Sequence, residues 1–264
     1  MLAHKTSLPV YRQIANQIAE EIKAGTRPPN SRIPSERELA ERFGISRMTA
    51  RAAINLLMQR GLVSRRSRAG VFVAQPKVRF DLSSPHGLHQ QLQKAGITPG
   101  AKIITAEVMP AHALDSRIVQ ALALHDGEKV YHIVRLRTAN DEPIALENSF
   151  FPVRLFPDLL DFNLTDSIYG ILKKYFGVEP AQSFQELEIS LLDEEWAEIM
   201  GVHMDLPILE IRRCAMTEDG TPFEYAHDIY RGDRIIFTAR TVKAGASSVG
   251  QIPQDAWNHL RPCS

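Results

Sequence analysis

The apolar residues at the start of the chain recur with the spacing of an α-helix. Residues 10–22 predict an amphipathic helix, since Val10, Ile14, Ile18 and Ile22 fall on one face. A second helix is predicted after Ser35, because Ser35 and Glu38 have the spacing of a capping box. Ser46 is the expected N-cap of a third helix, whose inward face carries Ala50, Ala53, Ile54, Leu57 and Met58.

The pattern changes after Gly61 from helical spacing to short apolar runs. Residues 62–64 and 70–73 predict two strands, joined by a loop that carries Arg65, Arg66 and Arg68. Gly44 separates the second helix from the third, at a position where a positive φ ends a helix. A helix, a glycine turn, a second helix and a basic hairpin, in this order, predict a winged helix-turn-helix.

The rest of the chain predicts an α+β domain, a sandwich of helices on antiparallel strands. Turn signals such as Asp219-Gly220 separate consecutive strands, and short helices lie between the pairs. The expected strands cover residues 102–109, 129–138, 143–150, 182–191, 207–216 and the stretch from 222, and the expected helices cover 86–95, 114–124, 165–175 and 193–200. We therefore expect a winged-helix domain (1–75), a linker (76–85), a C-terminal domain (86–245) and a loosely ordered tail (246–264).

The charged residues are divided unequally between these parts. The 264 residues contain 31 basic and 31 acidic side chains, yet residues 1–80 hold 15 basic and 5 acidic ones. This surplus suits a polyanionic partner. The two cysteines, Cys214 and Cys263, are too few for a disulfide framework or a cysteine-rich zinc site. Because no apolar segment is long enough to span a bilayer and no signal peptide is visible, we expect a cytoplasmic protein.

The third helix is the expected recognition helix of a DNA-binding domain. Arg47, Thr49 and Arg51 lie on the exposed side of its first turns, and such residues reach phosphates and base edges in the major groove. The alternative is that these arginines only keep a surface helix solvated. The scarcity of acidic residues around this helix favours contact with DNA.

Charged residues also occupy two neighbouring strands of the C-terminal domain. Arg135 and Arg137 are two residues apart and share one face of a strand, as do Glu147 and Ser149 on the next strand. An arginine pair can hold a phosphate or a carboxylate bidentately. The alternative is a structural salt-bridge network in which the arginines pair with Glu147 and Glu224.

The chain resembles the GntR family of bacterial transcription regulators, and its C-terminal domain resembles the UTRA domain of the HutC subfamily. The first resemblance rests on residues 34–40 (PSERELA), 46–51 (SRMTAR) and 70–73 (GVFV), and the second on residues 87–96 (GLHQQLQKAG), 135–137 (RLR), 142–147 (EPIALE), 167–169 (SIY) and 223–225 (FEY). This family resemblance implies a chorismate-lyase-like effector domain, a homodimer and a double-stranded operator with two inverted half-sites. It further implies that ligand binding repositions the DNA-binding heads. Neither a cofactor nor a metal ion is expected.

The resemblance also implies the residues of both sites. Those expected to contact DNA are Ser35, Arg37, Ser46, Arg47, Thr49, Arg51, Arg65, Arg66, Arg68 and Gly70. Those expected to line an effector pocket, as in the sugar-phosphate-sensing members, are Ser83, Ser84, Arg135, Arg137, Glu147, Ser167, Tyr169, Glu224 and Tyr230. The leading interpretation is a repressor of a catabolic or uptake operon, induced by a small anion such as an amino- or hexose phosphate.

Two other interpretations stay open. A regulator that senses an organic acid or a fatty acid would use the same arginines for a carboxylate. A chorismate-lyase-like enzyme would use Glu147, but the sequence shows no nucleophile–base pair and no set of metal ligands. The histidines have no metal-ligand spacing, and His86 and His89 are interpreted as ordinary residues of an amphipathic helix.

Overall fold

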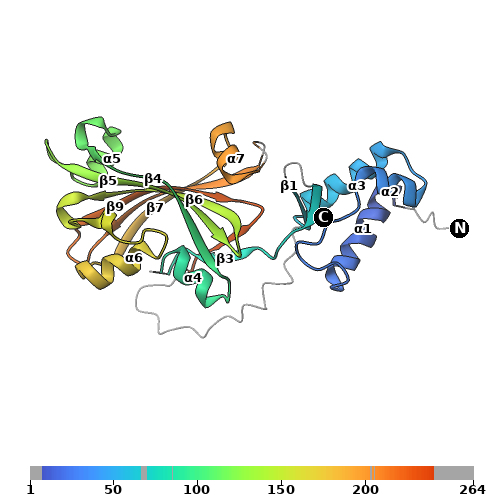
Figure 1. Ribbon diagram of the computed structural model, residues 1–264, viewed down its shortest axis with the longest axis horizontal. Coiled ribbons are helices and arrows are strands. Elements are labelled where there is room, and N and C mark those ends of the chain that lie inside the picture. The colour runs from blue at the N-terminus through green and yellow to red at the C-terminus, as the bar shows by residue number, and fades with distance from the viewer. Residues whose placement is uncertain (1–7, 67–69, 85, 203, 205, 241–264) are drawn as a thin grey trace, which may run out of the picture.

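The computed structural model describes residues 8–66, 70–84, 86–202, 204 and 206–240, and in these residues two domains lie end to end (Figure 1). The first contains α1 (Val10–Lys23), α2 (Glu36–Phe43) and α3 (Arg47–Gln59), followed by the antiparallel strands β1 (Val63–Arg66) and β2 (Gly70–Val73). The predicted winged helix-turn-helix is confirmed. Within the described residues, no helix is long and apolar enough to cross a membrane.

The ends of α2 and α3 are set by the residues that the sequence indicates. The amide of Glu38 donates to Ser35 Oγ at 3.3 Å and the amide of Ser35 donates to Glu38 Oε2 at 2.7 Å, so the capping box is formed. Gly44 ends α2 with a φ of 62°, which glycine adopts without a steric cost. Ser46 Oγ accepts the amide of Thr49 at 3.1 Å and starts α3.

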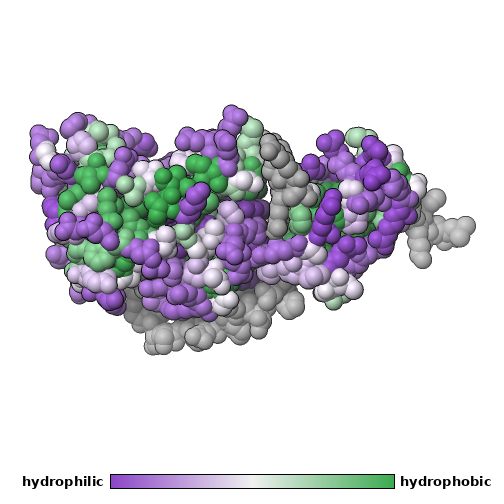
Figure 2. Space-filling model, viewed as in Figure 1, coloured by the Kyte–Doolittle hydropathy of each residue, from purple (hydrophilic) through white to green (hydrophobic). Residues whose placement is uncertain are grey.

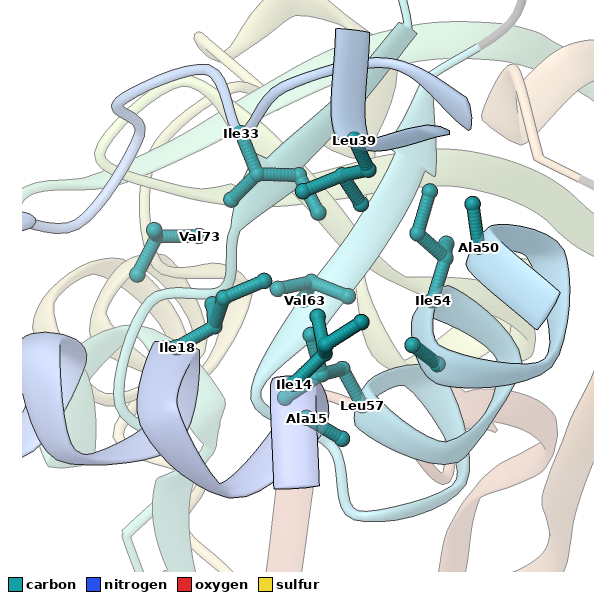
Figure 3. Close-up of a cluster of buried hydrophobic side chains, with 11 residues drawn as sticks. Ile14, Ala15, Ile18, Ile33, Leu39, Ala50, Ile54, Leu57, Val63 and Val73 are labelled. Carbon is teal, nitrogen blue, oxygen red and sulfur yellow. The ribbon is translucent and has the colours of Figure 1, made fainter. Parts of the chain in front are cut away.

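One hydrophobic cluster joins the three helices to the wing (Figure 3). Its buried members come from every element of this domain and from the loop before α2: Ile14, Ala15, Ile18, Ile33, Leu39, Ala50, Ala53, Ile54, Leu57, Val63 and Val73. Burial of such side chains is the main favourable term in folding. Because the cluster is shared, we expect the head to fold as a unit.

Replacing Leu39 by alanine is expected to destabilise the head. The side chain is fully buried, and deletions of this kind cost about 2–5 kcal/mol in free energy of unfolding. Val10→Ala in α1 is a matched control, because Val10 is half exposed and its loss should cost less than about 0.5 kcal/mol. Urea denaturation followed by circular dichroism measures both, and equal small losses would contradict the packing described.

The second domain is built on an antiparallel sheet with the strand order β4-β5-β6-β9-β8-β7, which confirms the α+β class. The strands are β4 (Pro99–Pro110), β5 (Lys129–Ala139), β6 (Glu142–Pro152), β7 (Gln182–Leu191), β8 (Pro207–Met216) and β9 (Pro222–Arg231). The α-helices are α4 (Leu88–Lys94), α5 (Ser116–Ala121), α6 (Ile168–Ile171) and α7 (Glu194–Met200). Figure 1 shows α4 and α6 on one side of the sheet and α5 and α7 on the other.

The buried clusters show which strand residues face which helices. Leu88 of α4 shares a cluster with Ala145, and Ile168 of α6 shares one with Ile133. Met200 of α7 packs in a cluster with even-numbered residues of the same two strands, among them Val134, Leu136 and Leu146. Because side chains alternate along a strand, Arg135, Arg137 and Glu147 face α4 and α6.

The predicted linker differs from the structure. Residues Val78–Asp81 form β3, which was not predicted and which pairs in parallel with β10 (Ile235–Thr238). The stretch predicted as one long strand from 222 is divided into β9 and β10. Val78 and Phe80 are buried in the cluster that contains Leu88. Four of the ten residues that the sequence suggests as a linker therefore belong to a strand of the second domain. The predicted tail, 246–264, lies outside the described residues.

Two predicted helices are shorter or less regular than expected. The segment 114–124 contains only α5, preceded by a 3-10 turn at Ala111–Ala113. In the segment 165–175, α6 continues as a π-helix at Leu172–Phe176, which Gly177 ends with a φ of 68°. Further 3-10 turns occur at Val153–Leu155 and Leu159–Asp161.

The chain that leaves the wing is anchored beside β10. Arg234 is almost fully buried, donates from Nη1 to the carbonyl of Gln75 at 2.6 Å and lies with Nε 3.2 Å from Glu142. Lys77 Nζ donates to the carbonyl of Gly232 at 2.7 Å. A buried guanidinium requires such partners, because its desolvation is otherwise unfavourable. The start of β3 is thus tied to the second domain only a few residues after the wing.

Candidate nucleic-acid interface and ligand pocket

Arginines of α3 and β1 meet at Glu36, the first residue of α2. Arg51 Nε lies 3.7 Å from Glu36 Oε1, and Arg65 Nη2 lies 3.8 Å from the same oxygen. Both arginine side chains are exposed, and ion pairs of this kind contribute little. The structure therefore brings predicted DNA contacts of the recognition helix and of the wing onto one surface.

Two further predicted DNA contacts are also exposed. Arg47 begins α3, with its side chain open to solvent. Arg37 lies on α2 and pairs with Glu41 at 3.4 Å, with both side chains about two-thirds exposed. Because this i,i+4 pair is weak, Arg37 remains available to a phosphate.

The predicted hydroxyl contacts already serve the protein's own backbone. Ser35 Oγ and Ser46 Oγ cap α2 and α3, and the hydroxyl of Thr49 lies 2.9 Å from Ser46 Oγ. A role of these three residues in binding phosphate stays a prediction.

The wing residues are placed in part. Gly70 has a φ of 113°, which favours glycine, and a Cβ there would lie 3.3 Å from Arg32 Nε. Arg66 ends β1 opposite Gly70, and Arg68 lies outside the described residues.

A cavity of about 80 Å³ lies on the face of the sheet that carries α4 and α6. It is lined by eight of the nine predicted effector contacts: Ser84, Arg135, Arg137, Glu147, Ser167, Tyr169, Glu224 and Tyr230. The exception is Ser83, which is exposed and accepts the amide of Arg240 at 2.7 Å instead. Its side chain turns toward the segment after β10, and a contact of Ser83 with an effector stays a prediction.

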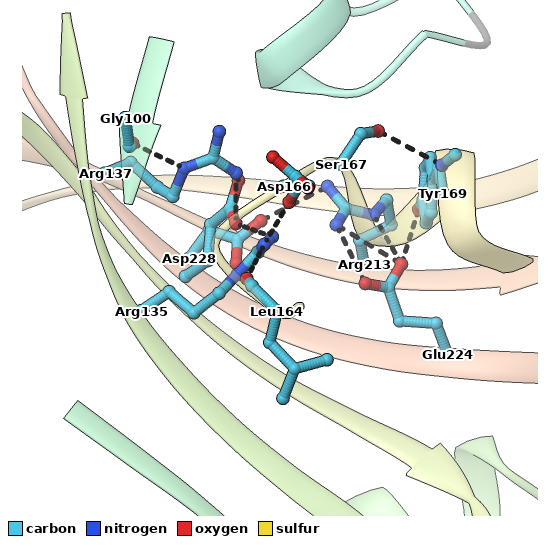
Figure 4. A network of polar contacts seen from close by, with 12 residues as sticks. Gly100, Arg135, Arg137, Leu164, Asp166, Ser167, Tyr169, Arg213, Glu224 and Asp228 are labelled. Carbon is cyan, nitrogen blue, oxygen red and sulfur yellow. Dashed lines mark hydrogen bonds and ion pairs between the residues drawn. The ribbon is translucent and has the colours of Figure 1, made fainter. Parts of the chain in front are cut away.

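Arg135 and Arg137 both bind Glu147 from the neighbouring strand (Figure 4). Arg137 Nη1 donates to Glu147 Oε2 at 2.9 Å, and Arg135 donates to the same oxygen. Arg135 Nη1 also donates to the carbonyls of Leu164 and Asp166, each at 2.9 Å. Burial alone would raise the pKa of Glu147, but the two guanidinium groups lower it to about 2, so this carboxylate is ionised.

One nitrogen of the Arg137 guanidinium donates no hydrogen bond to the described residues. The side chain of Arg137 is 1% exposed, and its Nε donates to the carbonyl of Gly100 at 3.2 Å. Its Nη2 is buried and has no hydrogen-bond partner among the described residues. Figure 4 shows one nitrogen of this guanidinium without a dashed contact. A buried donor in this state is unfavourable until an acceptor arrives.

A second ionic cluster lies beside the first and contains Arg213, which the sequence analysis missed. Arg213 binds Glu224 Oε2 at 3.3 Å and Asp228 Oδ2 at 3.2 Å. The hydroxyl of Tyr169 donates to Glu224 at 2.5 Å. Burial raises the pKa of Asp228 to about 7, although Arg213 opposes this effect.

A sequence signal for Arg213 existed. On β8, Ile211 and Ala215 are buried apolar residues, and Arg213 lies between them at the same side-chain phase. A charged residue at an inward position of a strand indicates a buried partner or a ligand. His86 and His89, interpreted above as ordinary helix residues, also line the cavity.

The comparisons with known proteins agree with this architecture. Residues 10–73 match the bacterial regulatory proteins of the gntR family, and residues 94–236 match the UTRA domain. The HTH-type transcriptional repressor NagR of Bacillus subtilis is 35% identical over 233 residues, which cover 88% of this chain and 95% of that one. The mannosyl-D-glycerate transport/metabolism system repressor MngR of Escherichia coli is 29% identical, with 90% and 96% covered.

The fold recurs among solved structures. The crystal structure of PhnF from Mycobacterium smegmatis superposes with a TM-score of 0.62 and 24% identity, and the match covers 87% of this chain and 99% of that one. The relatives are regulators rather than enzymes. The chain therefore belongs to the GntR family of bacterial transcription regulators with a UTRA domain, and it is a ligand-responsive DNA-binding regulator.

Proposed function

We propose that the protein is a repressor that releases its operator when a small anionic metabolite, an amino- or hexose phosphate, binds the pocket. The observation that carries the choice of ligand is the unpaired, buried Nη2 of Arg137. A phosphate oxygen would satisfy this donor with a charge-assisted hydrogen bond, which is stronger than a neutral one. The surrounding hydroxyls of Ser84, Ser167 and Tyr230 add donors of the kind that bind phosphate or sugar oxygens.

The remaining polar groups of the pocket suit the hydroxyls of a sugar. Glu224 is held by Arg213 and by Tyr169, yet a carboxylate has room for about four hydrogen bonds. It can therefore accept further bonds from ligand hydroxyls or from an amino group.

The size of the pocket supports a coupling between ligand and head. Pockets that enclose a drug-sized ligand commonly measure about 300–1,000 Å³, well above the about 80 Å³ found here. A hexose phosphate would have to displace part of the wall. That wall includes Phe80, Asp81 and Ser84, which follow the wing within a few residues. A shift of β3 would then move the segment that carries the DNA-binding head.

A carboxylate sensor is the second candidate. MngR is named for mannosyl-D-glycerate, a sugar acid, and the same arginines suit a carboxylate. Thermal-shift assays with glucose 6-phosphate, glucosamine 6-phosphate, the free sugars and simple organic acids separate the two. A phosphate sensor should be stabilised by the phosphate esters and far less by the free sugars, whereas stabilisation by acids alone would favour the carboxylate sensor.

We further infer that two copies bind an inverted repeat, in the cytoplasm. β7 is an edge strand whose apolar side chains Phe184, Leu187, Ile189 and Leu191 are exposed, and open edge strands invite pairing. Figure 2 shows a broad hydrophobic area on the second domain, whereas the visible face of the head is largely hydrophilic. A symmetric dimer presents two heads and would read two inverted half-sites.

Ile189→Lys is expected to give a monomer that binds the operator weakly. Ile189 is 81% exposed, so the change should not unfold the domain, but a charge at this edge opposes strand pairing. Analytical ultracentrifugation and titration with whole and halved operators measure the effect. Val108→Lys on the opposite edge strand, β4, is the control and should leave the dimer intact. A dimeric Ile189→Lys variant, or full affinity for a half-site, would contradict this arrangement.

A further inference from the structure

His89 separates two hollows of the second domain. It lines the arginine pocket and also a more open hollow of about 340 Å³, bordered by α4, α6 and the π-helix that follows. Ser167 is the other residue that lines both. The imidazole is therefore part of the wall between the outer hollow and the arginine pair.

The imidazole has an unused hydrogen-bonding group. Nδ1 of His89 is buried and has no partner in the structure. In a neutral imidazole this nitrogen is either a donor or an acceptor, and in the protonated ring both nitrogens donate. An anion beside the ring would engage it best in the protonated state.

Burial and the neighbouring arginines favour the neutral form of the His89 ring when no effector is bound. Burial lowers the pKa of His89, and Arg137 and Arg135 on β5 lower it further. Asp166 before α6 and Glu147 on β6 act in the opposite direction but do not reverse the shift. The ring is thus uncharged at pH 7, below which an ordinary histidine begins to take up a proton.

The pocket has little surplus of positive charge for a dianion. Arg135 and Arg137 face Glu147, and Arg213 faces Glu224 and Asp228, whose pKa of about 7 leaves it partly ionised at pH 7. A phosphate monoester carries nearly two negative charges at pH 7, since its second pKa is about 6. A negative charge within about 4–6 Å favours the protonated form of a histidine and raises its pKa.

We propose that His89 binds the effector and takes up a proton when a phosphate ester enters the pocket, which makes the response of this regulator dependent on pH. The inference rests on the proposed phosphate effector. The proton comes from the solvent, the ring becomes a cation, and it donates to an ester oxygen. Effector affinity is then higher at lower pH and falls as the pH rises through the range between the pKa values of the free and the bound ring.

Calorimetry tests the proton uptake directly. Glucose 6-phosphate and N-acetylglucosamine 6-phosphate, which have no titrating amine, are bound at pH 7.0 in buffers of different ionisation enthalpy. We expect the tighter of the two to take up about half a proton or more per site, as a rise of the pKa of His89 above 7 requires. An ester that binds as the dianion releases protons through its own ionisation, whereas one that binds as the monoanion takes up a proton. The His89→Gln variant separates the second case from protonation of His89, because uptake by the ester would persist in it. The corresponding 6-sulfate, a monoanion, should show little uptake.

The His89→Gln variant tests whether His89 is the group that takes up the proton. It should bind the ester at least about threefold more weakly at pH 7, with no proton uptake and with affinity nearly constant from pH 6.5 to 8. His112→Gln is the matched control, because His112 is an exposed histidine of the same domain. Undiminished uptake in His89→Gln would overturn the inference and direct attention to the ester itself, to His86, which lines the same cavity, and to Asp228, whose pKa is about 7.

NMR of the histidine rings in the wild-type protein gives an answer even if the variant does not fold. The ring signals of His89 should show the neutral form at pH 7 in the free protein and the protonated form in the complex. A neutral His89 ring in the complex would overturn this inference but not the proposed phosphate effector. If the wild type does not prefer the phosphate esters to the free sugars, the proposed effector is wrong, and this inference is wrong with it.

Discussion

Arg51→Ala is expected to abolish specific operator binding, and Arg47→Ala is expected to do the same. Both side chains are exposed on the first turns of α3, the part of a recognition helix that meets the base edges. Each bidentate contact with a base is worth about 1–3 kcal/mol, or about 5- to 150-fold in affinity. A dimer bound to an operator with two half-sites loses this contribution at each half-site. Fluorescence anisotropy with operator and random DNA, at several salt concentrations, measures the change.

Arg60→Ala is the matched control for these two variants. Arg60 follows the same helix at its other end, where it donates to Asn16 Oδ1 at 2.7 Å. Arg60→Ala removes the same charge as the other two variants. We nevertheless expect its operator affinity to fall by less than about threefold, because only long-range electrostatic attraction is reduced. Equal losses in all three variants would show that charge alone attracts the DNA and would contradict the role of α3.

Arg65 on the wing provides a second comparison. Arg65→Ala should weaken specific and random DNA alike and lower the slope of log affinity against log salt by about 1, as expected for a phosphate contact. An effect on the operator alone would instead assign Arg65 to a base.

Arg137→Lys is expected to abolish the response to the effector while leaving operator affinity near that of the wild type. Lysine keeps the charge beside Glu147 but loses the planar fork, and with it the donor that Nη2 offers to the ligand. Hydrogen bonds to charged groups are worth about 1.5–3 kcal/mol, so we expect effector affinity to fall by about 10- to 150-fold. Calorimetry with sugar phosphates and release of operator DNA measure the two properties.

The alanine variants test the structural alternative. Arg135→Ala and Arg137→Ala each remove a partner of the buried Glu147, and breaking a buried ion pair costs about 3–5 kcal/mol. If both alanine variants unfold and Arg137→Lys binds effectors as the wild type does, the arginines serve the fold rather than the ligand. Arg117→Lys, an exposed arginine beside Asp115, is the control and should change neither stability nor effector binding.

Linkage provides a check that does not depend on any variant. If the effector weakens operator binding by some factor, operator DNA must weaken effector binding by the same factor. Unequal factors would mean that the two ligands are not coupled through one equilibrium of the protein.

The sequence determined the head almost completely. The capping box at Ser35, the left-handed Gly44 and the apolar spacing of α3 are interactions among residues that lie within a few positions of each other. Such interactions depend on helical geometry alone, so they can be read without the rest of the fold. The hairpin of β5 and β6 is similarly local. Its turn lies at Asn140 and Asp141, but a bulge between Arg137 and Thr138 shifts the register by one residue, and this shift places Arg135 opposite Glu147.

The second ionic cluster and the linker were decided by the tertiary structure. Arg213 meets Glu224 and Asp228 through the pairing of β8 with β9, and meets Tyr169 only because α6 covers this face. β3 was not predicted, and it pairs with β10, which lies more than 150 residues further along the chain. His89 lines the pocket because α4 packs on the sheet. Periodicity indicates which side of an element is buried. Which segment covers that side depends on packing between distant parts of the chain, and this packing forms the pocket.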